Sequence, residues 1–382
     1  MNESLHTTDD AATVGPERPE LQQALQEIVD SGFAGLQVRV HDERGQWTGS
    51  AGVRKLGETA KPPTDGHFRI GSITKTFTAA LVLRLVAEGK FGLDDAAAEH
   101  LPEYGLDPRI TVRMLLQHTS GLFNFTGEVY EDGTIVSGVV PGVGKEWMDN
   151  QFRTYRPEDL VRQALARPAR FEPGADWSYS NTNYVLARLL IENVTGRSYD
   201  EEMRRLILDP LGLTGTVTPG TSPEIPEPHA HGYYGYDDAG EWKVADTTLF
   251  NPSWASTGGD MISTSKDLHT FFSALMSGKL LPAPLLAEMR TPHPKVGYGL
   301  GVFVEKTAGG GTIYQHNGGF WGWAALMYST PDGSKTLTGS LTCGDAELDW
   351  TAMGEAFEKV KQRLVTQVFG DGPDEQAGPP TA

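Results

Sequence analysis

The stretch FRIGSITKTF, residues 68–77, decides how this chain is interpreted. Beginning within this stretch, apolar residues recur at every fourth position, namely Ile73, Phe77, Leu81 and Leu85. This spacing predicts an amphipathic helix, which Gly89 is suited to end. If the helix begins near Ser72, it carries Ser72 and Lys75 on one face, because residues three apart are neighbours on a helix.

This S-x-x-K spacing has a chemical purpose. The N-terminus of a helix favours an alkoxide and lowers the proton affinity of a nearby amine, so Lys75, held neutral, can accept the proton of Ser72. The alternative is that Ser72 only caps a helix and Lys75 is solvated. A chain of this length holds on the order of one S-x-x-K by accident. It does hold a second, Ser263-Thr264-Ser265-Lys266, and local physics does not choose between them.

Two further motifs favour Ser72. Tyr179-Ser180-Asn181 is the only Y-x-N and precedes a helical pattern; a tyrosine beside a cation can shuttle a proton, and an asparagine amide can hold a carbonyl. His316-Asn317-Gly318 is the only H-x-G and ends a predicted strand, where glycines leave room for a substrate along the backbone. Each motif alone also fits a turn; together and in this order they predict one site.

Composition and charge exclude several classes of function. The 382 residues are 38% hydrophobic and 21% charged, as in globular proteins, and their formal charge of −18 argues against nucleic acid and anionic membranes as partners. Cys343 is the only cysteine, and His229 and His231 fit a solvated loop, so we expect neither a metal site nor a cofactor. The motifs of α/β-hydrolases, kinases, zinc proteases and dinucleotide-binding proteins are absent.

The order of patterns predicts the fold class. Alternating stretches near both chain ends predict strands, at residues 35–41, 46–53, 312–315, 323–329 and 335–341. Helical patterns lie at residues 20–30, 112–118, 157–166, 181–194, 266–276 and 346–368. We therefore predict an α/β protein of the α+β type, in which an antiparallel sheet built from both chain ends is flanked by helices and a mainly helical region is inserted.

One catalytic domain is expected overall. Its sheet region takes residues 18–70 and 290–368, and its helical region takes residues 71–289. Within the latter, the Gly-rich and aromatic stretch 121–151 is typical of a binding loop or a lid. Residues 1–17 and 369–382 have the composition of disordered tails.

The first residues bear on localisation. Residues 1–19 have neither the basic flank nor the apolar core of a secretory signal, and no run of 18 apolar residues occurs anywhere. We therefore expect a cytoplasmic protein, or a secreted one from which an export signal has been removed. No expectation about the oligomeric state follows from the sequence.

The three motifs resemble, in order and spacing, the S-x-x-K, Y-x-N and H-x-G set of the serine DD-carboxypeptidase branch of the penicillin-recognising enzymes, which includes class C β-lactamases. The flanking residues agree, as in His118-Thr119-Ser120-Gly121-Leu122, and the likeness covers roughly residues 20 to 365. The resemblance implies a β-lactamase/DD-peptidase-like fold. It also implies an acyl-enzyme intermediate on a serine.

The resemblance assigns roles residue by residue. Ser72 is expected to be the nucleophile and Lys75 its activating partner. Tyr179 is expected to act as general base, and as general acid toward the leaving group. Whether Lys75 or Tyr179 takes the first proton stays open. His316 would tune Tyr179, Asn181 would orient the acyl chain, and the backbone N–H groups of Ser72 and Gly319 would form the oxyanion hole. His118 is interpreted as structural.

Departures from that family concern the substrate. DD-carboxypeptidases hold a peptide carboxylate with an arginine on the strand before the third motif and with hydroxyls in an H-T-G-T run. Here residues 299–304 contain no arginine and residues 316–319 contain no hydroxyl, whereas Phe303, Trp321 and Trp323 add apolar surface. Losing charge-assisted contacts worth about 1.5–3 kcal/mol each should weaken recognition of a terminal D-Ala carboxylate.

The first hypothesis is therefore a cytoplasmic hydrolase or transacylase that forms an acyl-Ser72 intermediate. Its partner is a small-molecule or peptide ester or amide as acyl donor, and water or an amine takes the acyl group. The alternatives are a D-alanyl-D-alanine carboxypeptidase or weak β-lactamase, and a catalytically silent protein that binds peptides or β-lactams. Because a binder needs no nucleophile with its base, the set Ser72, Lys75 and Tyr179 argues against the silent protein.

Overall fold

A computed structural model describes residues 17–130, 132–307, 309–344 and 350–370. Its central sheet is antiparallel and has the order β2-β1-β13-β12-β10-β9, with β11 paired to β12. The strands are β1 (Phe33–Asp42), β2 (Gly45–Gly52), β9 (Phe303–Lys306), β10 (Thr312–Gln315), β11 (Gly318–Phe320), β12 (Trp323–Ser329) and β13 (Thr336–Cys343). The predicted antiparallel sheet built from both chain ends is confirmed.

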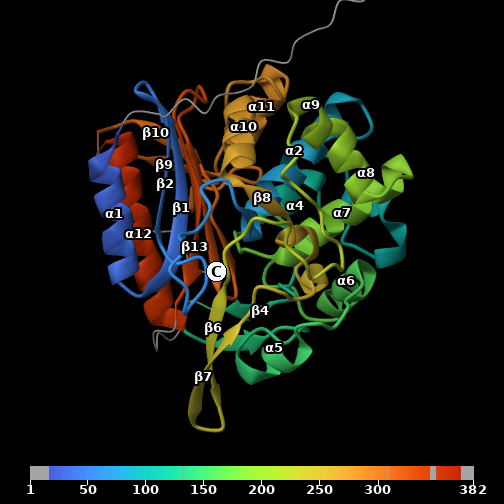
Figure 1. Ribbon diagram of the computed structural model, residues 1–382. Coiled ribbons are helices and arrows are strands. Elements are labelled where there is room, and N and C mark those ends of the chain that lie inside the picture. Colours follow the sequence, from blue (N-terminus) through green and yellow to red (C-terminus); the bar gives the residue numbers. More distant parts are fainter. Residues whose placement is uncertain (1–16, 131, 308, 345–349, 371–382) are drawn as a thin grey trace, which may run out of the picture.

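Two helices from opposite ends of the chain cover one face of this sheet, α1 (Pro19–Asp30) and α12 (Trp350–Phe369) (Figure 1). Leu25 of α1 and Leu364 of α12 share one apolar cluster with Val38 of β1. Each helix buries its apolar stripe against the strands, which is the way such helices are stabilised in proteins. The sheet is thereby closed on the side away from the predicted motifs.

The other side of the sheet carries the residues between the two sets of strands (Figure 1). Its helices are α2 (Thr74–Ala87), α3 (Ala97–His100), α4 (Val112–Gln117), α5 (Gly144–Asn150), α6 (Pro157–Leu165), α7 (Asn181–Thr195), α8 (Tyr199–Met203), α9 (Asp209–Leu211), α10 (Ser265–Met276) and α11 (Ala283–Arg290). Short helical turns are η1 (Gly71–Ile73), η2 (Pro102–Tyr104), η3 (Arg204–Leu208), η4 (Pro252–Trp254) and η5 (Ser256–Gly258). Short strand pairs are β3 (His67–Arg69) with β8 (Ile262–Thr264), β4 (Gly127–Val129) with β5 (Ile135–Ser137), and β6 (Tyr233–Asp238) with β7 (Glu241–Asp246).

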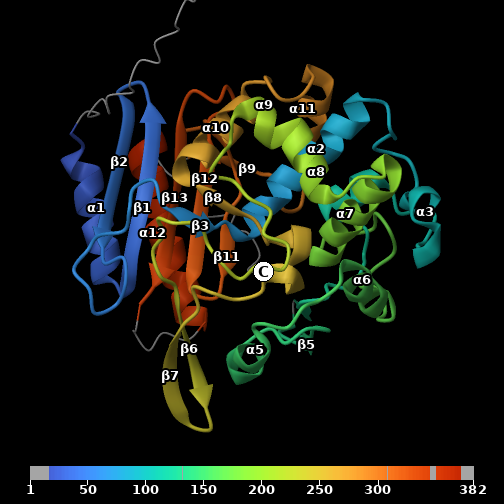
Figure 2. The same ribbon diagram turned by 45° about the vertical axis from the view of Figure 1, so that its right-hand side comes forward.

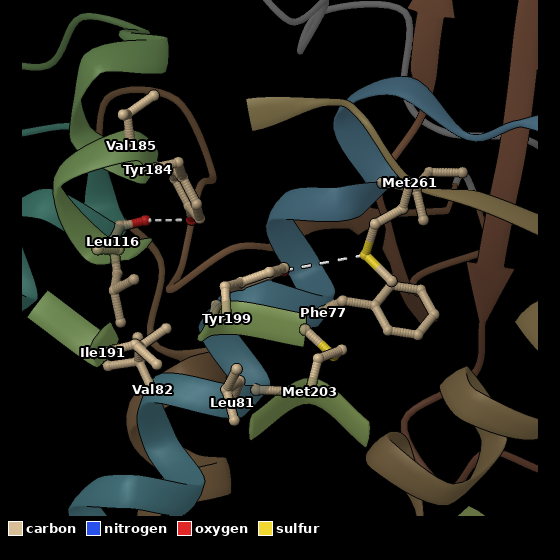
Figure 3. Packing of buried hydrophobic residues seen from close by; sticks show 14 of the residues in the cluster. Phe77, Leu81, Val82, Leu116, Tyr184, Val185, Ile191, Tyr199, Met203 and Met261 are labelled. Carbon is tan, nitrogen blue, oxygen red and sulfur yellow. Dashed lines mark hydrogen bonds between the residues drawn. The ribbon is translucent and has the colours of Figure 1, made fainter. Parts of the chain in front are cut away.

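Helix α2 differs from its prediction, because it is buried on nearly all sides rather than amphipathic. Thr74, Lys75, Thr76 and Thr78 are as inaccessible to solvent as Phe77. Figure 3 shows side chains of α2 packed among those of α7, α8 and neighbouring segments, including Phe77, Leu81, Val82, Tyr184, Ile191, Tyr199 and Met261. A helix buried all round belongs to the core of a large domain. No helix in the described part of the chain combines the length and hydropathy needed to cross a bilayer.

The segment 121–151, predicted as a binding loop or lid, contains regular structure. It forms the β4–β5 hairpin and α5, whose Trp147 is 2% exposed. The backbone N–H of Gly144 donates to the hydroxyl of Tyr234 on β6 at 2.8 Å, which ties this segment to the β6–β7 hairpin. That hairpin projects from the body of the molecule in Figures 1 and 2.

Candidate active site

Ser72 lies in the turn η1, which leads directly into α2 and places Lys75 one helical turn further on. The Nζ atom of Lys75 is 3.1 Å from the Oγ atom of Ser72 and donates to the carbonyl oxygen of Gly258 at 2.5 Å. Ser72 is half-buried, whereas Lys75 is fully buried. The two residues whose spacing suggested chemistry are therefore hydrogen-bonded to one another.

Tyr179 approaches Ser72 from the other side. It stands two residues before α7 begins, and its hydroxyl donates to Ser72 Oγ at 2.8 Å. Its ring lies 4.6 Å from Lys75 Nζ, close enough for a cation–π contact when the amine is charged. Residues separated by more than a hundred positions thus meet at one oxygen atom.

Burial sets the protonation of these groups. Loss of solvation lowers the pKa of Lys75 well below its ordinary value and raises the pKa of Tyr179 above its ordinary value. Both directions favour the uncharged form, an amine with a free lone pair and an intact phenol. This arrangement favours Lys75 as an acceptor of the Ser72 proton and Tyr179 as a proton donor.

The backbone around Ser72 meets that of β11 at very short range. Gly71 has φ +50°, a conformation that favours glycine, and a Cβ there would lie 2.7 Å from the nitrogen of Gly319. In the β11–β12 hairpin Phe320 faces Trp323 across a two-residue turn, so the next pair, Gly319 and Ala324, does not exchange hydrogen bonds. The N–H of Gly319 consequently points away from β12, which suits the predicted oxyanion hole.

Gly318→Ala is expected to slow acylation of Ser72 by about 100-fold, the typical cost of one lost oxyanion donor. The added methyl group would overlap the carbonyl oxygen of Ile70 and lie 3.0 Å from the nitrogen of Ser72, so β11 and η1 must separate. Gly319→Ala is the matched control for folding, since a Cβ there meets no atom within 4 Å. Rates of reaction with a fluorophosphonate, with Tm for both variants, check this; a wild-type rate for Gly318→Ala contradicts the predicted proximity.

Asn181 is held by residues that the sequence motifs did not include. Its backbone N–H donates to Asn124 Oδ1 at 3.0 Å, and its Nδ2 donates to Thr126 Oγ1 at 3.0 Å, while the Thr126 hydroxyl donates to Asn124 Oδ1. Asn124 Oδ1 accepts a backbone N–H and is therefore the oxygen of its amide. The Thr126 hydroxyl donates to this oxygen, so it must accept from Asn181, and the group of Asn181 that faces Thr126 is therefore the NH₂. The buried Glu128, paired with Arg170, accepts from the N–H of Asn124 at 2.8 Å and anchors this segment. The only sequence signal for these supporting residues was the Gly-rich stretch 121–151.

His316 is hydrogen-bonded to groups other than Tyr179, the residue that it was expected to tune. Its Nδ1 lies 2.7 Å from the carbonyl oxygen of Asn317, and its Nε2 lies 3.3 Å from the hydroxyl of Tyr298. No hydrogen bond is found between His316 and Tyr179, both of which are in the described part of the chain. His118 lies behind Tyr179 with ring centroids 4.4 Å apart, and its Nδ1 accepts from the N–H of Ser180.

Phe303 and Trp321 pack against different sets of aromatic residues. Phe303, half-buried on the edge strand β9, packs its ring 4.6 Å from that of Tyr298 and 5.6 Å from that of His316. Trp321, in the β11–β12 turn, belongs to an aromatic cluster with Trp147, Tyr234 and Trp254. Because Trp254 stays half-buried beside this turn, the cluster offers apolar surface next to Gly319.

The second S-x-x-K is not assembled into a site. Ser263 lies in strand β8, fully buried and paired with Phe68, and its Oγ is 2.8 Å from Thr216 Oγ1. Lys266 is exposed on α10, which begins only at Ser265. Among the described residues, no group of three His, Cys, Asp or Glu side chains is arranged to hold a metal ion, and His231 pairs with Asp246.

Comparison with protein families gives one description for most of the chain, since the family model "Beta-lactamase" matches residues 21–343. The chain is 27% identical to Penicillin-binding protein 4* of Bacillus subtilis over 75% of its own length and 63% of that protein. It is 28% identical to Protein flp of Staphylococcus aureus over 57% of its own length and 40% of that protein. The chain thus spans less than two thirds of the length of these relatives.

Solved structures extend the likeness. The chain resembles a D-stereospecific amidohydrolase from Streptomyces sp., with 38% identity, a TM-score of 0.79 and coverage of 93% of this chain and 99% of that one. It also resembles the D-amino acid amidase of Ochrobactrum anthropi SV3 complexed with L-phenylalanine amide, with 26% identity, a TM-score of 0.73 and coverage of 91% and 98%.

Proposed function

The chain belongs to the beta-lactamase family, whose members are serine hydrolases, and from that premise we propose that it hydrolyses or transfers the acyl group of D-amino-acid amides or esters through an acyl-Ser72 intermediate. The predicted family and its fold are confirmed by these matches. One observation carries the proposal: Ser72 Oγ is hydrogen-bonded to both Lys75 Nζ, at 3.1 Å, and the Tyr179 hydroxyl, at 2.8 Å. A nucleophile between a neutral amine and a phenol is equipped for acyl transfer.

Acylation in this proposal begins with transfer of the Ser72 proton to Lys75, the group that burial keeps deprotonated. Ser72 Oγ attacks the substrate carbonyl, and the N–H groups of Ser72 and Gly319 stabilise the resulting oxyanion. Tyr179 donates its proton to the leaving amine or alcohol as the bond to the acyl carbon breaks, and it recovers a proton from the Lys75 ammonium, whose Nζ lies over its ring. Asn181 orients the acyl portion of the substrate.

Deacylation reverses these proton movements. Tyr179 passes its proton to Lys75 and takes the one proton that water or an amine gives up as it attacks the acyl carbon. Ser72 Oγ then leaves with a proton from the Lys75 ammonium. An amine held beside the acyl group outcompetes water through its effective concentration. The apolar surface of Phe303 and of the Trp321 cluster supports substrates and acceptors with apolar groups.

Stereospecificity is the sharpest test of the substrate class. The D-phenylalanine amide and methyl ester are expected to react at least about 10-fold faster than their L enantiomers, a difference of about 1.4 kcal/mol between diastereomeric transition states. Initial rates for both enantiomers, with water alone and with an added amine, measure hydrolysis and transfer together. Equal rates for the enantiomers argue against D-amino-acid derivatives as substrates, while an intact-mass adduct on Ser72 would still support the acyl-enzyme.

A D-alanyl-D-alanine carboxypeptidase is the second candidate, favoured by the likeness to Penicillin-binding protein 4*. Phe303 on β9 argues against this candidate, because a DD-carboxypeptidase needs a cation on this strand to bind the peptide carboxylate. Phe303→Arg is therefore expected to raise kcat/KM for a peptide ending in D-Ala-D-Ala by about 10-fold, the lower range of a charge-assisted contact.

Two controls separate charge from the loss of the ring in that experiment. Phe303→Leu removes the contacts with Tyr298 and His316 without adding charge. The same peptide with a C-terminal amide lacks the carboxylate, so it should gain nothing from Phe303→Arg. Equal rates for the free acid in wild type and Phe303→Arg would contradict the carboxylate argument.

A further inference from the structure

The two hydrogen bonds of His316 determine where its proton resides. A carbonyl oxygen only accepts, so the contact of 2.7 Å between His316 Nδ1 and the oxygen of Asn317 requires a proton on Nδ1. In the neutral ring Nε2 is then an acceptor. Its partner at 3.3 Å, the hydroxyl of Tyr298, must be the donor.

Two acceptors compete for the proton of Tyr298, namely His316 Nε2 and the hydroxyl oxygen of Tyr184. The hydroxyl of Tyr184 lies 3.4 Å from that of Tyr298, and because it donates its own proton to the carbonyl oxygen of Leu116 at 2.8 Å, its oxygen is free to accept (Figure 3). The contact with His316 Nε2 is the shorter of the two for Tyr298. A nitrogen lone pair is a strong acceptor, so the hydrogen of Tyr298 points to His316.

Packing holds Tyr298 in this position. The residue is fully buried in the loop between α11 and β9, and its carbonyl oxygen accepts from the N–H of His293 at 2.8 Å. Its ring lies 4.6 Å from the ring of Phe303 and 5.0 Å from that of His118. A side chain enclosed in this way has few rotamers open to it, so its hydroxyl is presented to His316 in one direction.

The charged and titratable groups facing His316 all disfavour a positive imidazole. Lys75 of α2 lies near it, His118 at the end of α4 is a second base, and Tyr298 presents a donor where an imidazolium would need an acceptor. Burial first and Lys75 second lower the pKa of His316 to about 3. His118 is neutral as well, with its Nδ1 accepting from Ser180 N–H and Asn183 Nδ2, both at 3.2 Å.

We propose that Tyr298 is a positioning residue that fixes the ring of His316, which burial keeps neutral, with its proton on Nδ1, so that Lys75 alone among these buried bases carries the proton taken from Ser72. This inference rests on the acyl-enzyme function proposed above. If His316 were protonated, its positive charge would repel a charge on Lys75 across a poorly solvated site. That repulsion would oppose the protonation of Lys75. Burial of His316 prevents that, and Tyr298 adds to the effect by occupying the lone pair of Nε2.

Tyr298→Phe keeps the ring and removes only the donor. Without it the neutral form of His316 loses a hydrogen bond, so the pKa of His316 rises and its protonated form appears at higher pH. Because His316 also loses the partner that orients its ring, the rate of Ser72 phosphonylation by a fluorophosphonate is expected to fall about 10-fold, the lower range for groups that orient an active residue. The acid limb of its pH profile is expected to move to higher pH.

Tyr184→Phe is the matched control, because it removes the neighbouring buried hydroxyl but leaves the Tyr298–His316 contact intact. It should lower Tm through the lost bond to Leu116 and keep the wild-type pH profile. A Tyr298→Phe variant that also keeps the wild-type pH profile would overturn the proposal, whatever its Tm.

Nitrogen NMR of the wild-type histidines determines which ring nitrogen of His316 carries the proton, even if Tyr298→Phe does not fold. The proposal requires His316 with protonated Nδ1 and bare Nε2 throughout the range in which the enzyme is folded; a protonated Nε2 overturns it. This readout needs no substrate. Failure of the acyl-enzyme function, seen as the absence of any adduct on Ser72, is therefore distinguishable from failure of the inference about Tyr298.

Discussion

Ser72→Ala is expected to abolish formation of the acyl-enzyme and to lower kcat/KM by about 10⁴- to 10⁶-fold, the range found when a catalytic nucleophile is removed. The only oxygen bonded to both Lys75 and Tyr179 among the described residues is then gone, and neither partner has a nucleophile to activate. Intact-mass spectrometry after treatment with a fluorophosphonate or a β-lactam should show one adduct on the wild-type protein and none on Ser72→Ala.

The second S-x-x-K provides the matched control. Ser263→Ala alters a motif of the same pattern, but its hydroxyl meets Thr216 inside strand β8 and has no access to Lys266 on the exposed face of α10. We expect Ser263→Ala to retain the adduct and most of its kcat/KM, with a fall in Tm from the lost hydrogen bond. Loss of all activity in a folded Ser263→Ala protein would reassign the nucleophile.

Lys75→Met is expected to slow phosphonylation of Ser72 by about 1,000-fold, within the range for a lost general base. Methionine fills much of the same buried space but accepts no proton. In the wild type, burial lowers the pKa of Lys75, so the amine is neutral above that pKa and becomes protonated as pH falls through it. Activity should therefore be lost toward acid pH in the wild type, and this limb should be missing from the residual activity of Lys75→Met.

Lys266→Met is the control for a lysine of the same motif pattern, because Lys266 is exposed and should tolerate the change with little effect on rate or Tm. Tm of Lys75→Met should not fall steeply, since burying an amine in poorly solvated surroundings is itself costly. If Lys75→Met keeps both the wild-type rate and the wild-type acid limb, Lys75 is not the base, and Tyr179 remains to be tested by Tyr179→Phe.

Sequence periodicity predicted strands β1, β2, β10, β12 and β13 of the central sheet but neither β9 nor β11. The apolar alternation in β1, β12 and β13 and the spacing in α7 and α10 are local patterns, and such patterns report which face of an element is buried. They failed for α2, where Thr74, Thr76 and Thr78 are polar in sequence yet buried. Their hydroxyls form hydrogen bonds inside the protein; that of Thr76, for example, donates to the carbonyl oxygen of Gly301 at 2.7 Å. These bonds offset the cost of burying a polar group, and because the partners are distant in sequence, a local pattern does not show them.

The sequence by itself determined the family, the antiparallel sheet from both chain ends, and the set of Ser72, Lys75, Tyr179, Asn181 and His316 as candidates, because these depend on spacing and order. Only the tertiary structure showed that Ser263 of the second S-x-x-K is buried against Thr216, brought Asn124 and Thr126 to Asn181, and turned His316 toward Tyr298 rather than Tyr179. Hydrogen bonds have directions and reach about 3 Å, so their partners depend on how distant segments pack. That packing is a property of the whole chain and not of any motif within it.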